Sequence, residues 1–178
     1  MSVYVTGVTY NGVAMTRVDD VGTANRWFNL WYLTAPATGA HDIVVSLSAS
    51  SFCGLAAASY TGVSQTGQPE VELETAGASP LSLGLTTLTD NSWIIAGAKA
   101  ETGNTAAGTG ATLRGADNLG ITAILDSGGA ITPAGAATLE VTGTTAMGGI
   151  SIAIAPAGAV ATKAKPMFRR STRFFTGR

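Results

Sequence analysis

Residues 27–62 read WFNLWYLTAPATGAHDIVVSLSASSFCGLAAASYTG and hold three consecutive strand patterns with turns between them. The first, residues 26–33, carries large apolar side chains on both faces, as expected of a strand that lies centrally in a sheet. A Pro-Ala-Thr-Gly turn follows at 36–39, and residues 41–48 then alternate between a mainly apolar and a mainly polar face. Residues 53–63 are mostly Gly, Ala and Ser, and we predict that they form a strand under the large aromatic side chains.

The rest of the chain continues this pattern of short strands and turns. Asn11-Gly12, between alternating residues, predicts a type I′ hairpin with Tyr10 opposite Val13. We expect a polar loop at residues 19–25 and a charged, exposed edge strand at residues 70–74. Further strands are predicted at residues 3–8, 81–86, 93–98, 111–114, 120–125, 137–142 and 149–155. With no segment of helical period, the sequence predicts an all-β protein, an antiparallel β-sandwich of the immunoglobulin-like or jelly-roll kind.

Length and composition predict one folded domain. The chain has 178 residues, of which 46% are hydrophobic and 12% charged. A chain of this length can bury about 70% of its unfolded surface. No apolar run approaches the length of roughly 18 residues that a membrane span needs, and no secretory signal pattern opens the chain. A single cysteine, Cys53, excludes an internal disulfide framework.

The charges divide the chain into an acidic body and a basic arm. Residues 1–162 hold eleven acidic and four basic residues, a net charge of −7, whereas residues 163–178 hold six basic residues and no acidic one, a net charge of +6. We therefore predict a sandwich domain over residues 1–157, followed by a linker and a basic, aromatic C-terminal arm over residues 158–178.

The arm is the predicted partner-binding segment. Its guanidinium groups suit carboxylates or phosphates, and its phenylalanines suit apolar pockets. Three phenylalanines in this short segment favour a protein partner over nucleic acid, which stays the less favoured alternative. The residues assigned to partner binding are Lys163, Lys165, Phe168, Arg169, Arg170, Arg173, Phe174, Phe175 and Arg178.

Residues that could support catalysis or hold a metal are sparse. His41 is the only histidine and has no cysteine nearby, so we interpret it as a surface residue at the start of a strand. Asp19 and Asp20 are interpreted as solvated loop acids, and residues 108–110 as a loop that lacks the glycines and helix of a phosphate cradle. Cys53 is predicted to be a small buried hydrophobe. The sequence thus predicts a protein that is not an enzyme, with no metal and no cofactor.

Four aromatic residues raise the alternative of a carbohydrate-binding module. Trp27, Trp31, Trp93 and Tyr32 have flat faces on which sugar rings could stack. All four lie within strand patterns that have apolar neighbours, which favours a place in the core.

Three stretches of the first third of the chain resemble a known module. VTYNGVAMTRV at residues 8–18, LWYLTAPATGAHDIVVSLS at residues 30–48 and AAASYTGVSQT at residues 56–66 are similar to a β-sandwich module of bacteriophage virion proteins and some large bacterial surface proteins. The resemblance covers about residues 8–67. It implies a β-sandwich and a non-catalytic part of an assembly, and it does not include the arm.

Taken together, these features predict a phage structural protein located in the virion. We expect a capsid decoration or cement protein, homo-oligomeric, whose arm binds the major capsid protein or neighbouring subunits. A tail or fibre component of the virion is the first alternative, and a receptor- or glycan-binding module is the second. No membrane association is expected.

Overall fold

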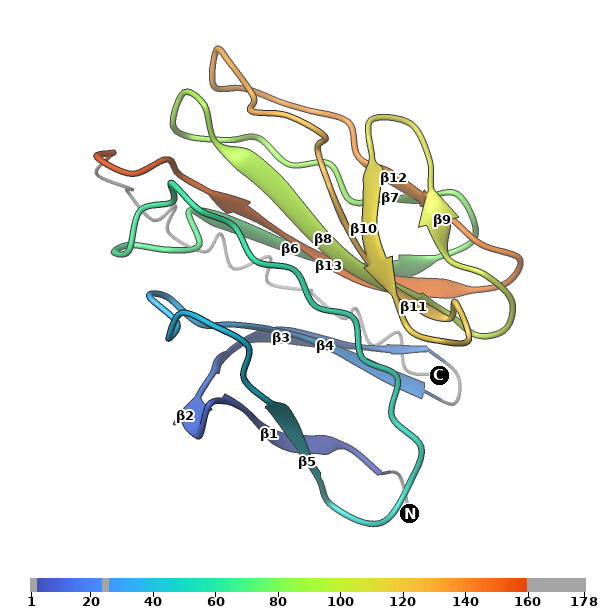
Figure 1. The fold of residues 1–178 in the computed structure, drawn as a ribbon. Helices are drawn as coiled ribbons and strands as arrows, with labels where there is room; N and C mark the ends of the chain where they lie inside the picture. Colours follow the sequence, from blue (N-terminus) through green and yellow to red (C-terminus); the bar gives the residue numbers. More distant parts are fainter. Residues whose placement is uncertain (1–2, 24–25, 160–178) are drawn as a thin grey trace, which may run out of the picture.

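Thirteen antiparallel strands and no helix make up the computed structural model, which describes residues 3–23 and 26–159 (Figure 1). No helix in this part of the chain is long and apolar enough to span a membrane. In chain order the strands are β1 (Val5–Tyr10), β2 (Val13–Ala14), β3 (Thr16–Thr23), β4 (Arg26–Tyr32), β5 (Ile43–Leu47), β6 (Val71–Gly77), β7 (Leu81–Ser82), β8 (Trp93–Ala100), β9 (Ala106–Ala107), β10 (Thr112–Ala116), β11 (Thr122–Asp126), β12 (Glu140–Thr142) and β13 (Met147–Ile154).

The chain opens with the hairpin that the Asn-Gly pair predicts. Asn11 and Gly12 have positive φ angles of 49° and 74°, as a type I′ turn requires, and Tyr10 pairs with Val13. Strand β5 joins the other side of β1, giving a three-stranded sheet in the order β2-β1-β5.

Strands β3 and β4 form a separate two-stranded sheet. The expected loop at residues 19–25 is wrong for residues 19–23, which belong to β3, where Asp19 and Asp20 pair with Leu30 and Asn29 of β4; residues 24–25 lie outside the described part of the chain. Acidic residues are depleted in strands, yet here they pair with β4, with a register shift between Arg17 and Asp19. Figure 1 shows this sheet as a layer between the β2-β1-β5 sheet and the large sheet. Strand β4 thus lies in the middle layer, but the expectation that it lies centrally in a sheet is wrong, because its sheet has two strands and β3 is its one partner there.

The largest sheet has five strands in the order β10-β11-β8-β13-β6. Strand β8 occupies the middle, as its apolar sequence on both faces predicts, and all of its residues after Trp93 are buried. Strand β6 is an edge strand in which exposed Glu72 and Glu74 alternate with partly buried Val71 and Leu73, as predicted. The prediction is wrong for Glu70, which is buried and lies just before the strand.

One face of the five-stranded sheet packs against the small sheet β7-β12-β9. Fully buried Leu83, Leu125, Leu139 and Met147 form the centre of this core. Gly149 allows the layers to approach closely, since a Cβ atom there would lie 2.7 Å from Cδ1 of Leu83.

The opposite face packs against β3 and β4. Phe28 and Leu30 of β4 and Val21 of β3 meet isoleucines of β8, β11 and β13, namely Ile95, Ile124, Ile150, Ile152 and Ile154. The ring of Phe28 lies over Gly97, where a Cβ atom would be 2.5 Å from Cζ of the ring. Because successive residues of a strand point to opposite faces, β8 and β13 contribute side chains to both hydrophobic cores. The molecule is an all-β antiparallel sandwich, as predicted, with a further layer on its second face.

The strand predicted at residues 53–63 is wrong. Residues 51–60 belong to no strand and are exposed, except for partly buried Ala56 and Tyr60. Val63 alone makes an isolated antiparallel bridge, with Pro156. The segment crosses the molecule as a connection from β5 towards β6 (Figure 1). A strand needs a neighbour whose backbone groups are in register, and none of the described residues provides one here.

Candidate functional site

The predicted partner-binding residues lie outside the part of the chain that the structure describes, which ends at residue 159. This holds for Lys163, Lys165, Phe168, Arg169, Arg170, Arg173, Phe174, Phe175 and Arg178. The candidate site described here lies in the sandwich domain, near the end of the described chain.

A hollow of about 390 Å³ lies at this end of the molecule. The first residue of β8 and the final residues of β11 and β13 line it, together with residues 58–63. Its polar and aromatic lining residues include Tyr60, Asn91, Trp93, Arg114 and Asp126. The rings of Tyr60 and Trp93 contact each other at 6.2 Å between centroids, with a tilt of 54°.

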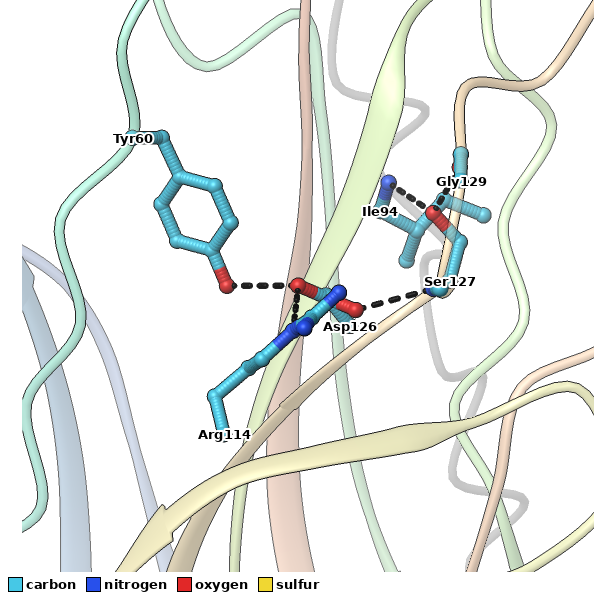
Figure 2. A network of polar contacts seen from close by, with 7 residues as sticks. Tyr60, Ile94, Arg114, Asp126, Ser127 and Gly129 are labelled. Atoms are coloured by element: carbon cyan, nitrogen blue, oxygen red, sulfur yellow. Dashed lines mark hydrogen bonds and ion pairs between the residues drawn. The ribbon is translucent and has the colours of Figure 1, made fainter.

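Asp126 is the polar centre of the hollow and is fully buried (Figure 2). Its Oδ2 atom accepts hydrogen bonds from the Tyr60 hydroxyl at 3.0 Å and from Nε of Arg114. Its Oδ1 atom accepts from the backbone N–H of Gly128 at 2.8 Å. A carboxylate without solvent contact needs such partners, because an unpaired buried charge is costly.

The network continues into the turn after β11. Ser127 accepts a hydrogen bond from the backbone N–H of Ile94 at 3.3 Å and donates one to the carbonyl of Gly129 at 2.7 Å (Figure 2). Asp126 and Ser127 thus connect the turn to β8, while Tyr60 connects the irregular segment to the five-stranded sheet.

These contacts set the ionisation of the hollow. Burial, followed by the charge of Asp126 and the hydrogen bond to it, raises the pKa of the Tyr60 hydroxyl far above its ordinary value. The hydrogen bond to Asp126 raises the pKa of Arg114. Tyr60 therefore remains a protonated donor, and both oxygens of Asp126 already accept hydrogen bonds. The arrangement therefore stabilises the fold by holding Tyr60 against the five-stranded sheet.

Of the four aromatic residues considered for sugar stacking, three belong to β4 and the fourth, Trp93, begins β8. Trp93 lines the hollow, whereas Trp27, Trp31 and Tyr32 are not among its lining residues. The expectation that all four belong to the core is wrong for Trp27, which is 52% exposed and whose ring covers Gly22 on the neighbouring strand. Trp31 and Tyr32 are partly buried, and the Tyr32 hydroxyl donates to the carbonyl of Gln68 at 3.1 Å.

The structure also shows the surroundings of His41 and Cys53. His41 is exposed just before β5, as predicted, with a ring nitrogen 3.1 Å from the Thr38 carbonyl and an edge-on contact with Tyr10. Cys53 is exposed, so the prediction of a buried hydrophobe is wrong. The prediction of burial assumed a covered strand at residues 53–63, and the structure has no strand there. Residues 108–110 form a loop, as predicted.

Asp19 and Asp20 contribute to an acidic surface where β3 lies near β6. Partial burial, together with the charges of Asp19 and Asp20, raises the pKa of Glu74. Asp20 also forms an ion pair with Arg17 at 2.8 Å. Within the described ranges, no group of three or more His, Cys, Asp or Glu residues is placed to hold a metal ion.

The sequence analysis missed Tyr60, Arg114 and Asp126. A signal was present, since Asp126 closes the apolar run of β11 and Arg114 stands on the strand that pairs with it. Strand β10 pairs with β11 so that Thr112 is opposite Asp126, and Arg114 lies at the register shift between Leu113 and Gly115, from which its side chain reaches Asp126.

Comparison of the chain with protein-family models, with curated proteins and with solved structures gave no match.

Proposed function

We propose that this chain is a non-enzymatic structural protein of a bacteriophage virion, a capsid decoration or cement protein that its C-terminal arm holds on the particle. The observation that carries the proposal is the division of charge between the sandwich and the arm. The layered sheets provide a preformed body, and the arm provides the attachment to the major capsid protein or to neighbouring subunits.

Three of the four basic side chains of the body form ion pairs with acidic residues of the body. Arg17 pairs with Asp20, Lys99 with Glu101 at 3.3 Å, and Arg114 with Asp126. These pairs leave an excess of carboxylates on the surface of the body, among them exposed Asp42, Glu72, Glu74 and Asp90. Copies of such a body repel one another unless cations are supplied.

The arm supplies those cations. It carries six basic residues in the last sixteen positions, with three phenylalanines among them. Arginine forms bidentate pairs with carboxylates, and aromatic anchors in apolar pockets dominate the binding energy of protein interfaces. A chain with an acidic body and a basic, aromatic end is thus equipped to link neighbouring subunits of an assembly. The resemblance of residues 8–67 to a virion module supports the same conclusion.

Deletion of residues 163–178 tests this proposal. The last strand of the described chain ends at Ile154, so the truncated protein should keep the circular dichroism spectrum and melting temperature of the sandwich. It should fail to sediment with particles that lack the protein, whereas the full chain should bind to saturation. Truncated protein that still decorates particles at full occupancy would show that the sandwich surface carries the contact.

Salt dependence separates the two chemistries of the arm. Docking of phenylalanines on a protein neighbour should be nearly insensitive to salt, whereas contacts of six cations with packaged nucleic acid should weaken log-linearly as salt rises. Binding to purified tails or fibres in place of capsids would favour the alternative assignment within the same virion.

A further inference from the structure

Arg114 has hydrogen-bond donors that the network in the hollow does not use. It contacts Asp126 through Nε, and within the described residues neither of its Nη atoms has a hydrogen-bond partner. Its side chain lines the hollow and is 38% exposed, whereas Asp126 is fully buried. A guanidinium group has five N–H donors, so those on the two Nη atoms remain available to a ligand.

Asp126 fixes the orientation of this guanidinium group. Because the contact is made through Nε, the end of the group with Nη1 and Nη2 suits the two oxygens of a carboxylate. Asp126 itself has little left to offer a ligand, since its oxygens already accept hydrogen bonds from Tyr60, Arg114 and Gly128. These two are the charged residues among those that line the hollow, and the accessible one is the cation.

Beside the guanidinium group, the hollow has an aromatic wall and a polar rim. Tyr60 and Trp93 form the wall, and both are partly buried. Ser59, Thr61 and Asn91 are exposed lining residues, and within the described ranges their side chains make no hydrogen bond. Hydroxyl and amide groups of this kind can both donate to and accept from the hydroxyls of a ligand.

We propose that the hollow binds a sugar ring that carries a carboxylate, the unit of an acidic saccharide. The carboxylate accepts hydrogen bonds from the Nη groups of Arg114, the ring packs against Trp93, and the sugar hydroxyls bind the rim. The volume of about 390 Å³ lies within the range of roughly 300–1,000 Å³ that small-molecule sites have. An apolar ligand fits less well, because it removes water from the guanidinium group and the rim without replacing those hydrogen bonds.

Titration of the purified full-length protein with sodium glucuronate tests this site. Nuclear magnetic resonance should show the indole N–H signal of Trp93 shifting to saturation. Glucose lacks the carboxylate and should bind at least about tenfold more weakly, because a hydrogen bond to a charged group is lost. Benzoate has a carboxylate on a ring without hydroxyls and should also bind more weakly than glucuronate. The measurement uses no particles, so its failure leaves the proposed attachment through the arm untouched.

Two lysine variants each replace one guanidinium group and keep its charge. Arg114→Lys retains a cation beside Asp126 but cannot bind a carboxylate end-on through two Nη atoms, so it should weaken glucuronate binding about tenfold or more. Arg17→Lys is the matched control, since Arg17 pairs with Asp20, is 50% exposed and lies outside the hollow. This control should bind glucuronate as the wild type does.

A third variant keeps the test decisive if Arg114→Lys folds poorly. Asn91→Gly removes a rim amide at a φ of 64°, a conformation that glycine adopts readily, so the protein should stay folded. Loss of one hydrogen bond should weaken glucuronate binding about threefold or more.

Four results would overturn the inference. The Trp93 signal could remain unchanged in glucuronate. Glucose could bind as tightly as glucuronate, which would show that no carboxylate is recognised. Benzoate could bind as tightly, which would identify an aromatic acid as the ligand. Arg17→Lys could weaken binding as much as Arg114→Lys, which would show that the hollow is not the site.

Discussion

Gly97→Ala is the substitution that most sharply tests how β4 lies on the large sheet. The new methyl group would lie 2.5 Å from Cζ of Phe28, nearer than Cβ atoms approach in real structures. Gly97 is in the central strand β8, and Phe28 is buried in the second core, so neither residue can move without disturbing other layers.

Two opposing effects set the change in unfolding free energy that Gly97→Ala should cause. Overpacking of a filled core costs typically about 1–3 kcal/mol. Replacing a strand glycine with alanine returns about 0.5–1 kcal/mol, because glycine loses more conformational freedom on folding. The net expectation is a destabilisation of about 1–2 kcal/mol, and a domain of this size should melt about 2–8 °C lower.

The sign of the effect should depend on Phe28. In a Phe28→Leu background the distal ring atoms are gone, so Gly97→Ala should be neutral or stabilising by up to about 1 kcal/mol. Gly149→Ala is the matched control, since it meets Leu83 on the opposite face and should cost the same in both backgrounds. Thermal and urea unfolding of the four combinations measure the coupling. Equal costs of Gly97→Ala in both backgrounds would show that β4 does not cover the sheet at this point.

Further predictions concern the first hairpin and the hollow. Gly12→Val should lower the melting temperature markedly, because a β-branched residue is strongly disfavoured at a φ of 74°; an unchanged melting temperature would exclude the type I′ turn. Tyr60 has a raised pKa, so its contribution to stability should be complete below the unfolded value of about 10 and decline as pH rises above it. The difference in unfolding free energy between wild type and Tyr60→Phe should therefore be constant from neutral pH to about pH 9 and shrink beyond; a difference that grows with alkalinity would contradict the assigned contacts.

Local sequence patterns correctly predicted the parts of the fold that depend on residues close together in the sequence. The hairpin at Asn11-Gly12 follows from the φ angles that its turn demands, and buried β8 follows from an apolar sequence on both faces. The exposed edge of β6 follows from its alternating glutamates.

Features that depend on distant partners could not be read from the sequence. Asp19 and Asp20 look like loop residues until β4 is placed beside them. The strand predicted at residues 53–63 is wrong because its Gly, Ala and Ser residues do not reveal whether a neighbouring strand exists to pair with them. The hydrogen bonds to Asp126 join three separate segments, and only the folded arrangement brings Tyr60 and Arg114 to one carboxylate.

The virion assignment is tested most directly by an electron cryo-microscopy reconstruction of particles that carry the full-length protein. The proposal predicts the sandwich at regular positions on the capsid surface, with residues 163–178 in ordered density against a neighbouring protein subunit. A sandwich that contacts the particle through its sheets, with no density for residues 163–178 on any neighbour, would contradict the account.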